Sequence, residues 1–350
     1  MTNPYENLPS EAFWRPAVAD RNMFEIDNLW KPKFNINKTD KIVAFGSCFA
    51  QNITKEISTR GYNWHITENP PWGFSEDNCK KFNYNIFSAR TGNIYTTSLL
   101  RQWTEWALGK KKVPDEIWKN KDHFIDPFRP NIEPDGFGDE DELRRSQAYS
   151  IHCFYRCIKE ADYFIFTLGL TESWINKKGE YEYPMCPGTI AGEFSNENHE
   201  FVNLYFEDVR SNLAQAMKLM IEANPNLKFI FTVSPVPLTA TYSNKHVILA
   251  TMYSKSILRS VVGQISANWN NVDYFPSYEF FNSPVFKGTF FQPNQRNVNS
   301  HGVKIVMDLF FSSIEKNRDI ISTKNSTNQT FQKSKNDTVC EEEILEAFAK

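Results

Sequence analysis

The sequence lacks several features that define large classes of protein. Its 350 residues contain no apolar run near the ~18–20 residues that cross a bilayer, and its start lacks the basic stretch and apolar core of a secretory signal. It has no basic excess, because 39 Lys and Arg stand against 42 Asp and Glu, for a formal charge of −3. Non-specific nucleic-acid binding therefore has no electrostatic basis. We expect a cytoplasmic protein with no membrane span and no nucleic-acid partner.

The six cysteines lack the paired spacing that marks a zinc site. In a chain without an export signal we expect them to be reduced. Cys153 and Cys157 lie four residues apart beside His152 in a helical stretch. This is half of a metal site or, more simply, two small buried side chains on one helix face. We predict no metal ion and no tightly bound cofactor.

Aromatic residues are unusually abundant in this chain. There are 29 Phe, 14 Tyr and 9 Trp, which make up 15% of the residues. A hydrophobic core must absorb most of them, because aromatic side chains bury large apolar areas. Tyr and Trp also form platforms for sugar rings, so the surplus is compatible with a carbohydrate ligand.

Short apolar runs and helical patterns alternate along the chain. Continuous apolar runs predict buried parallel strands, which we expect at residues 41–46, 62–66, 163–168, 228–233 and 272–275. The expected helices are 49–60, 94–108, 141–159, 206–223, 246–268 and 303–314. This alternation implies an α/β fold with a doubly wound parallel sheet. Ligands in such folds bind beyond the carboxyl ends of the strands.

Three further segments accompany the predicted α/β domain, which spans residues 41–318. Residues 1–40 are expected to pack on its core as an N-terminal segment. Residues 109–145 form a polar surface insertion that is either a solvated loop or a lid over the strand ends. Residues 319–350 combine a polar, flexible linker with a short helix at 341–350, which could dock on the domain or on a partner protein.

The end of the first strand carries the most informative motif, Phe45-Gly46-Ser47-Cys48-Phe49. A helix follows the strand at once, so the Ser47 hydroxyl should lie at the carboxyl edge of the sheet beside a helix N-terminus. Ser47 is therefore either a nucleophile or a simple helix cap. Cys48 is a rival nucleophile, although we expect its side chain to point to the other side and pack in the core.

A serine nucleophile needs a base, and His301 has the best setting among the six histidines. It stands in Asn299-Ser300-His301-Gly302, immediately before the last expected helix. In a parallel sheet this position faces the same edge as Ser47. The simpler interpretation is a surface residue at a helix start.

The motif Gly46-Ser47-Cys48-Phe49-Ala50 resembles the signature of the GSCFA family, which is grouped with the SGNH/GDSL-type esterases. The resemblance runs in order through about residues 3 to 316. It includes the blocks Gly92-Asn93-Ile94-Tyr95, Thr167-Leu168-Gly169-Leu170 and Ser234-Pro235-Val236. It implies a flavodoxin-like sheet with the nucleophile just after the first strand, which matches Ser47.

The resemblance also implies an oxyanion hole made by the nucleophile's own N–H, a glycine N–H and an asparagine side chain. Gly92, followed by Asn93, is the candidate glycine block. The block that usually reads Gly-x-Asn-Asp is here Gly169-Leu170-Thr171-Glu172. Thr171 thus replaces the asparagine, and Asn93 could supply the amide instead. Losing one such donor costs ~3 kcal/mol in the transition state, so some group should fill this place.

Superfamily members usually carry an aspartate three residues before the histidine, where this chain has Val298. No carboxylate lies between residues 292 and 302. His301 would then be oriented by a backbone carbonyl, by Glu279 or by Glu172. For Glu279 the alternative is an exposed charge at a helix start.

Together these features predict a serine-dependent ester hydrolase or acyltransferase acting on an O-acylated carbohydrate, with Ser47 as nucleophile and His301 as base. A transferase would need an acyl donor such as acetyl-CoA, and the chain has no phosphate-cradling motif. The alternative is a non-catalytic glycan-binding or scaffold protein on a degenerate fold of the same type.

Overall fold

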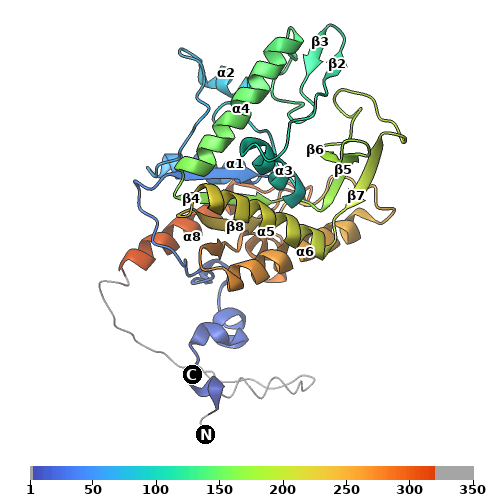
Figure 1. The fold of residues 1–350 in the computed structure, drawn as a ribbon. Helices are drawn as coiled ribbons and strands as arrows, with labels where there is room; N and C mark the ends of the chain where they lie inside the picture. Colours follow the sequence, from blue (N-terminus) through green and yellow to red (C-terminus); the bar gives the residue numbers. More distant parts are fainter. Residues whose placement is uncertain (1–2, 320–350) are drawn as a thin grey trace.

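A computed structural model of the chain describes residues 3–319, so the linker and terminal helix predicted beyond residue 320 lie outside the described residues. Four parallel strands form the central sheet in the order β1-β4-β8-β9 (Figure 1). Their bounds are Ile42–Gly46 (β1), Tyr163–Leu168 (β4), Lys228–Val233 (β8) and Val272–Tyr274 (β9). Four of the five predicted strands and the parallel sheet are confirmed.

The fifth predicted strand, residues 62–66, is wrong as a strand. Trp64 makes a single parallel bridge with Ile42 at the edge of the sheet. The pairing stops there because the next strand position is occupied: the Ala44 N–H donates to Ser88 Oγ at 3.1 Å. With this segment included, the order matches the 2-1-3-4-5 sequence of flavodoxin-like sheets.

Helices cover both faces of the sheet, and all six predicted helices are present. The seven that flank it are Ala50–Thr59 (α1), Thr97–Ala107 (α3), Glu140–Glu160 (α4), Phe206–Ala223 (α5), Val247–Asn268 (α6), Ser277–Asn282 (α7) and Ser300–Asp319 (α8). Residues of α3, α4, α5 and α6 share one core cluster with the sheet, and residues of α1, α7 and α8 share the other. The fold is therefore doubly wound, as predicted.

Phenylalanines on alternating strand positions build one of these two cores. Phe45, Phe164 and Phe229 lie side by side on adjacent strands, with ring centroids 5.4 and 6.0 Å apart. Residues between them in sequence, such as Ala44 and Ile165, face the opposite core. A large share of the aromatic surplus is thus buried in the core.

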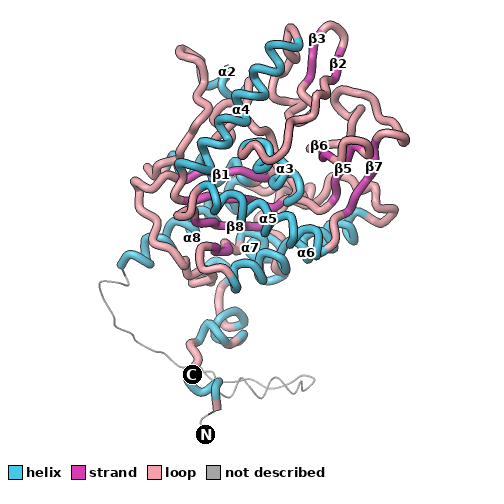
Figure 2. The backbone as a smooth tube through the Cα atoms, in the orientation of Figure 1, coloured by secondary structure: helices cyan, strands magenta, loops and turns pink. Residues whose placement is uncertain are grey.

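The remaining elements were not predicted because they are short. Residues 60–96 are mostly loop around α2 (Glu76–Lys81) (Figure 2). A second sheet, of order β6-β5-β7, is antiparallel and comprises Glu172–Asn176 (β5), Tyr181–Tyr183 (β6) and His199–Asn203 (β7). The insertion at 109–145 contains a hairpin of Trp118–Asn120 (β2) and His123–Ile125 (β3). Trp118 and Ile125 are buried in the main core.

The N-terminal segment has two parts. Its later residues Trp30, Phe34 and Ile36 are buried in the core on the α1 and α8 side of the sheet. Its first turns, the short helical pieces Pro4–Asn7, Ser10–Ala12 and Arg15–Ala19, lie away from the sheet (Figure 1). A fourth piece, Met23–Glu25, packs against the core through Met23. Within residues 3–319 no helix combines the length and apolar character needed to cross a membrane.

Candidate active site

Ser47 lies at the carboxyl end of β1, where the chain requires glycine at the preceding position. Gly46 has a φ of +131°, and a Cβ on it would lie 2.4 Å from the carbonyl oxygen of Thr167. The Ser47 N–H donates to that same oxygen at 3.1 Å, which extends the pairing of β1 with β4. This N–H is therefore occupied and is not available for the oxyanion role predicted for it.

The Ser47 hydroxyl is buried and has no hydrogen-bond partner in the part of the chain that the structure describes. The residue is 2% exposed, and its Oγ has neither a donor nor an acceptor among the described residues. Helix α1 begins at Ala50, and its cap residue Phe49 makes no side-chain capping bond. Ser47 thus does not cap α1, and the capping interpretation is wrong.

Ser47 lines a cavity of about 560 Å³, a size typical of small-molecule sites. The segments that follow β4 and β8 form most of its walls, and α6 and the loop before α8 contribute one residue each. The main wall residues are Cys48, Tyr95, 169–170, 172–174, 183–186, 236–242, Lys255 and Arg296. Residues 109–145 are not part of these walls, so the structure gives the predicted lid no contact with this cavity.

Cys48 is exposed and lines the same cavity, so the prediction that it packs in the core is wrong. The alternation of a strand ends at Gly46, where the chain turns toward α1. The next apolar residue, Phe49, takes the buried position at 1% exposure. Cys48 therefore stands beside Ser47 as a second possible nucleophile.

His301 is not brought to Ser47. Its side chain is exposed at the start of α8, and its ring centroid lies 6.4 Å from those of Phe24 and Phe290. The adjacent Gly302 faces the core, where a Cβ would lie 2.5 Å from Phe290 Cβ, so the helix start turns His301 outward. The predicted hydrogen bond between Ser47 and His301 is not formed.

The two carboxylates considered for His301 have other partners. Glu279 accepts hydrogen bonds from Arg259 and, at 2.6 Å, from the Tyr274 hydroxyl. Glu172 lines the Ser47 cavity and accepts from the Thr241 hydroxyl at 2.5 Å. Neither carboxylate orients the imidazole in this structure.

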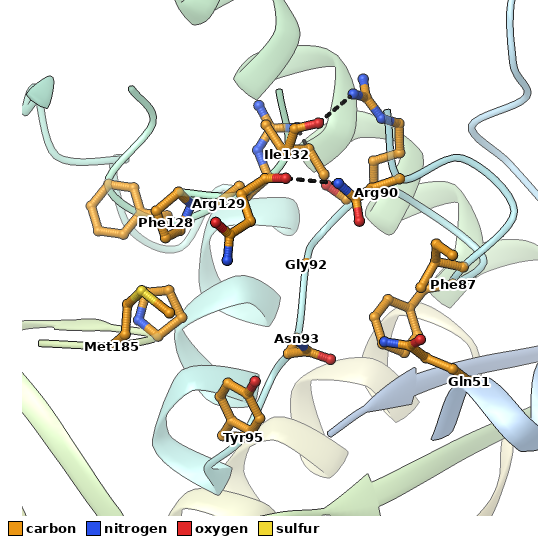
Figure 3. Close-up of a pocket in the computed structure, with 15 residues that line it drawn as sticks. Gln51, Phe87, Arg90, Gly92, Asn93, Tyr95, Phe128, Arg129, Ile132 and Met185 are labelled. Atoms are coloured by element: carbon orange, nitrogen blue, oxygen red, sulfur yellow. Dashed lines mark hydrogen bonds between the residues drawn. The ribbon is translucent and has the colours of Figure 1, made fainter. Parts of the chain in front are cut away.

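The residues predicted to form the oxyanion hole do not come together in one site. The Thr171 hydroxyl donates to Asn203 Oδ1 at 2.7 Å, so its proton is already used. Gly92 and Asn93 line a separate small cavity of about 80 Å³ together with Tyr95 (Figure 3). Tyr95 lines the Ser47 cavity as well. The Gly92-Asn93 block is therefore a neighbour of the site, and the buried Asn93 Oδ1 has no partner among the described residues.

Two cationic residues of the cavity were missed by the sequence analysis. Lys255 lies on the buried stripe of α6 and is 1% exposed. Burial lowers its pKa to about 7; a Cys48 thiolate would raise that value, and the Arg296 charge lowers it. Arg296 comes from the loop before α8, and its Nε is buried without a partner among the described residues. Lys255 is spaced three and seven residues from Leu258 and Val262, which places it on the same face of an apolar helix. A lysine on such a face indicates a buried charge, and this pattern could have identified Lys255 from the sequence.

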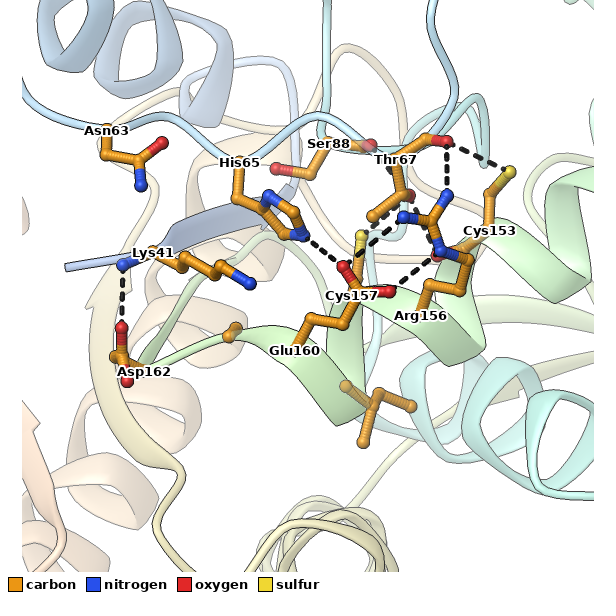
Figure 4. A network of polar contacts seen from close by, with 12 residues as sticks. Lys41, Asn63, His65, Thr67, Ser88, Cys153, Arg156, Cys157, Glu160 and Asp162 are labelled. Atoms are coloured by element: carbon orange, nitrogen blue, oxygen red, sulfur yellow. Dashed lines mark hydrogen bonds and ion pairs between the residues drawn. The ribbon is translucent and has the colours of Figure 1, made fainter. Parts of the chain in front are cut away.

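The cysteine pair on α4 is structural. Cys153 and Cys157 are both fully buried, and the Thr67 hydroxyl lies 3.1 Å from Cys157 Sγ (Figure 4). Burial raises the pKa of Cys153 to about 11, which disfavours a reactive thiolate. His152 is exposed on the same helix, and within residues 3–319 no three potential metal ligands cluster.

An aromatic groove adjoins the Ser47 cavity. This second cavity of about 660 Å³ shares Trp174, Phe201 and Tyr242 with the first. The centroid of the Trp174 ring lies 5.6 Å from that of Phe201 and 5.1 Å from that of Tyr242. The Tyr242 residue is 62% exposed. The groove thus presents aromatic faces next to the serine.

Comparison with protein families gives one assignment. Residues 41–310 match the model of the GSCFA family, which covers most of the chain. The matched region contains Ser47 and every wall residue of its cavity. A comparison with curated proteins gave no match.

Proposed function

The chain belongs to the GSCFA family, and we propose that it is a cytoplasmic enzyme that uses Ser47 to transfer an acyl group, such as acetyl, from an O-acylated carbohydrate. The observation that carries the proposal is the buried Ser47 Oγ, which lines a ligand-sized cavity and has no hydrogen-bond partner within residues 3–319. A buried hydroxyl left unpaired costs stability, and catalysis is one reason to retain it. The position after the first strand also agrees with the SGNH-type resemblance.

The proposed chemistry is acyl transfer in two steps. Ser47 Oγ bonds to the acyl carbon, the C–O bond of the ester breaks, and the serine proton ends on the departing alcohol. Water or a second sugar hydroxyl then attacks the acyl-serine and regenerates the serine hydroxyl. Attack by water makes the protein a hydrolase, and attack by a sugar hydroxyl makes it a transferase. Acetyl-CoA is a candidate acyl donor for the transferase.

Donors for the oxyanion are available at the turn into α1. The N–H groups of Cys48 and Phe49 have no acceptor among the described residues. The N–H of the residue after a nucleophile commonly serves this role in hydrolases with a strand-to-helix nucleophile turn. We assign Cys48 N–H to the oxyanion hole in place of the Ser47 N–H.

The carbohydrate part of the proposal is supported by the aromatic groove. Sugar rings present apolar C–H faces that pack on aromatic side chains, and hydroxyls that need polar neighbours. Trp174 and Tyr242 supply the first requirement, while Lys177, Glu200 and Asn244 line the same groove and supply the second.

The test compares wild type, Ser47→Ala and Cys48→Ala on p-nitrophenyl acetate and then on acetylated glycans. We expect Ser47→Ala to abolish turnover and Cys48→Ala to retain most of it. Turnover that survives in Ser47→Ala and disappears in Cys48→Ala would reassign the nucleophile to the cysteine.

A second candidate is a non-catalytic glycan-binding protein. The observation in its favour is that His301, the base predicted for the serine, packs against Phe24 and Phe290 outside the cavity. This alternative requires wild type and Ser47→Ala to bind glycans equally well, with no ester turnover by either.

A further inference from the structure

Lys255 is a lysine at a fully buried position of an apolar helix. It shares the buried face of α6 with Ser254, Leu258 and Val262. Its Nζ donates to the carbonyl oxygen of Gly169 at 2.8 Å, and the residue lines the cavity that contains Ser47. Lysine is almost never fully buried unless it is paired, so this position needs a physical reason.

No carboxylate of the described residues pairs with Lys255. Within residues 3–319 it forms no ion pair, and its bond to Gly169 is its only hydrogen bond. The ionisable cavity residues on other elements are Cys48, Tyr95, Glu172, Tyr183, Cys186, Tyr242 and Arg296. Glu172, the one carboxylate among them, accepts instead from Thr241. Burial without a counter-ion favours the neutral amine, which carries a lone pair and can act as a base near neutral pH.

Gly169 connects the lysine to the serine. Its carbonyl oxygen holds Lys255 Nζ, and a Cβ built on it would lie 3.0 Å from Ser47 Cβ. Rotation about the Ser47 Cα–Cβ bond moves Oγ between staggered positions without displacing the backbone. Catalytic hydrogen bonds commonly shorten only when substrate binds.

We propose that the amine of Lys255, and not the imidazole of His301, accepts the Ser47 proton when the serine attacks an acyl carbon. This inference rests on the proposed acyl transfer. The Oγ–H bond breaks as the Oγ–C bond forms, and the proton converts the amine to an ammonium. The ammonium then protonates the leaving alcohol as the ester C–O bond breaks, and the amine is restored. Serine–lysine pairs perform this role on unrelated folds.

The test measures the rate at which a fluorophosphonate labels Ser47 in the full chain, because labelling needs an activated nucleophile and does not need the natural acyl substrate. Lys255→Met keeps the length and burial of the side chain without the amine. We expect it to slow labelling at least about a hundredfold, the lower end of a general base contribution. Lys218→Met, at an exposed position of α5, is the matched control and should label like wild type.

Two further measurements separate a base from a structural role. The wild-type rate should rise as pH increases through about 7, where the lysine loses its proton, and this rise should be absent in Lys255→Met. Tyr95 stays protonated in this range because burial raises its pKa to about 12. Cys48 lines the same cavity as a second nucleophile, so the profile is repeated in Cys48→Ala. Methylamine added to Lys255→Ala should restore part of the rate.

The outcomes distinguish this inference from the proposed function. If wild type is not labelled at Ser47, the acyl-transfer function fails and the inference fails with it. If wild type is labelled and Lys255→Met is labelled equally fast, only the inference fails. Loss of labelling in His301→Ala would return the role to the histidine. Should Lys255→Met not fold, the absence of amine rescue in Lys255→Ala would overturn the inference.

Discussion

Lys255 and Gly169 are joined by a 2.8 Å hydrogen bond from the lysine Nζ to the glycine carbonyl oxygen. Gly169 follows β4 directly and also lies against Ser47 and Tyr95. Helix α6 and the end of β1 therefore meet at a residue without a side chain. Any Cβ at this point has to push the serine, the tyrosine or the backbone that holds the lysine.

Gly169→Ala should accordingly impair the site more than the fold. The added Cβ would lie 3.0 Å from Ser47 Cβ and 3.1 Å from the Tyr95 carbonyl oxygen, so both must move by a few tenths of an ångström. We expect a loss of about 1–3 kcal/mol in the free energy of unfolding, as for other overpacked sites, together with slower labelling of Ser47. Chemical denaturation and fluorophosphonate labelling measure the two effects.

The control for this variant is Gly263→Ala on α6, where the new Cβ would meet only the flexible end of the Arg259 side chain. Alanine favours a helix interior over glycine, so this variant should be as stable as wild type or more stable. Equal labelling rates in Gly169→Ala and Gly263→Ala would contradict the close packing at Ser47.

Arg296→Gln should move the pH dependence of labelling to higher pH. Burial lowers the pKa of Lys255 to about 7, and the Arg296 charge acts in the same direction. Removing that charge raises the lysine pKa, so the amine becomes available only at higher pH. Arg296→Lys keeps the charge and should keep the wild-type midpoint. Arg210→Gln, at an exposed site on α5, should leave the midpoint unchanged. An unshifted or lowered midpoint in Arg296→Gln would show that the two cations are not coupled.

The sheet was predicted well from the sequence because a short, continuous apolar run fits few structures other than a buried strand. The segments at β1, β4 and β8 are buried along nearly their whole length, and this pattern is local. The edge segment at 62–66 failed because its pairing depends on Ser88, a residue that no local pattern connects to it.

The site was predicted only in part, for a related reason. The position of Ser47 follows from one strand and one turn, which are local. The loop before α8 does reach the cavity, but through Arg296 and not through His301. Which residue of a loop points inward depends on tertiary packing, here the burial of Gly302 under Phe290. Lys255 lies on the buried face of α6, and the sequence analysis predicted this helix without distinguishing its faces.

Tyr242→Ala should weaken carbohydrate recognition without affecting the chemistry. Tyr242 is largely exposed, packs edge-on against Phe201 and lines both the groove and the Ser47 cavity. We expect a higher KM for an acetylated oligosaccharide and an unchanged kcat on p-nitrophenyl acetate, since binding remote from the reacting atoms is lost. Trp72→Ala removes a fully exposed aromatic residue outside the groove and serves as the control. Equal KM values for the two variants would remove the groove from substrate binding.

Glu182→Gln should flatten the dependence of stability on pH. Glu182 is 5% exposed in β6 and accepts a hydrogen bond from the Thr96 hydroxyl. Burial raises the pKa of Glu182, and hydrogen bonds from neighbouring hydroxyls offset only part of that effect. The folded chain therefore binds this proton more tightly than the unfolded chain. The associated stability is present at acidic pH, below the unfolded pKa, and is lost as pH rises through the folded pKa.

The wild-type free energy of unfolding should thus fall across this window, by at most about 1.4 kcal/mol per pH unit for one proton. Glutamine carries no charge at any pH. Its carbonyl oxygen can still accept from Thr96, and its amide can donate to the neighbouring Ser173 Oγ. We expect Glu182→Gln to lose less stability than wild type as pH rises above the ordinary glutamate pKa of about 4.3, measured by urea unfolding at each pH. Glu197→Gln, at an exposed turn, should follow the wild-type profile. If Glu182→Gln also shows the wild-type dependence of stability on pH, the Glu182 carboxylate is ionised and solvated in the folded chain. That result would contradict the burial of this side chain in β6.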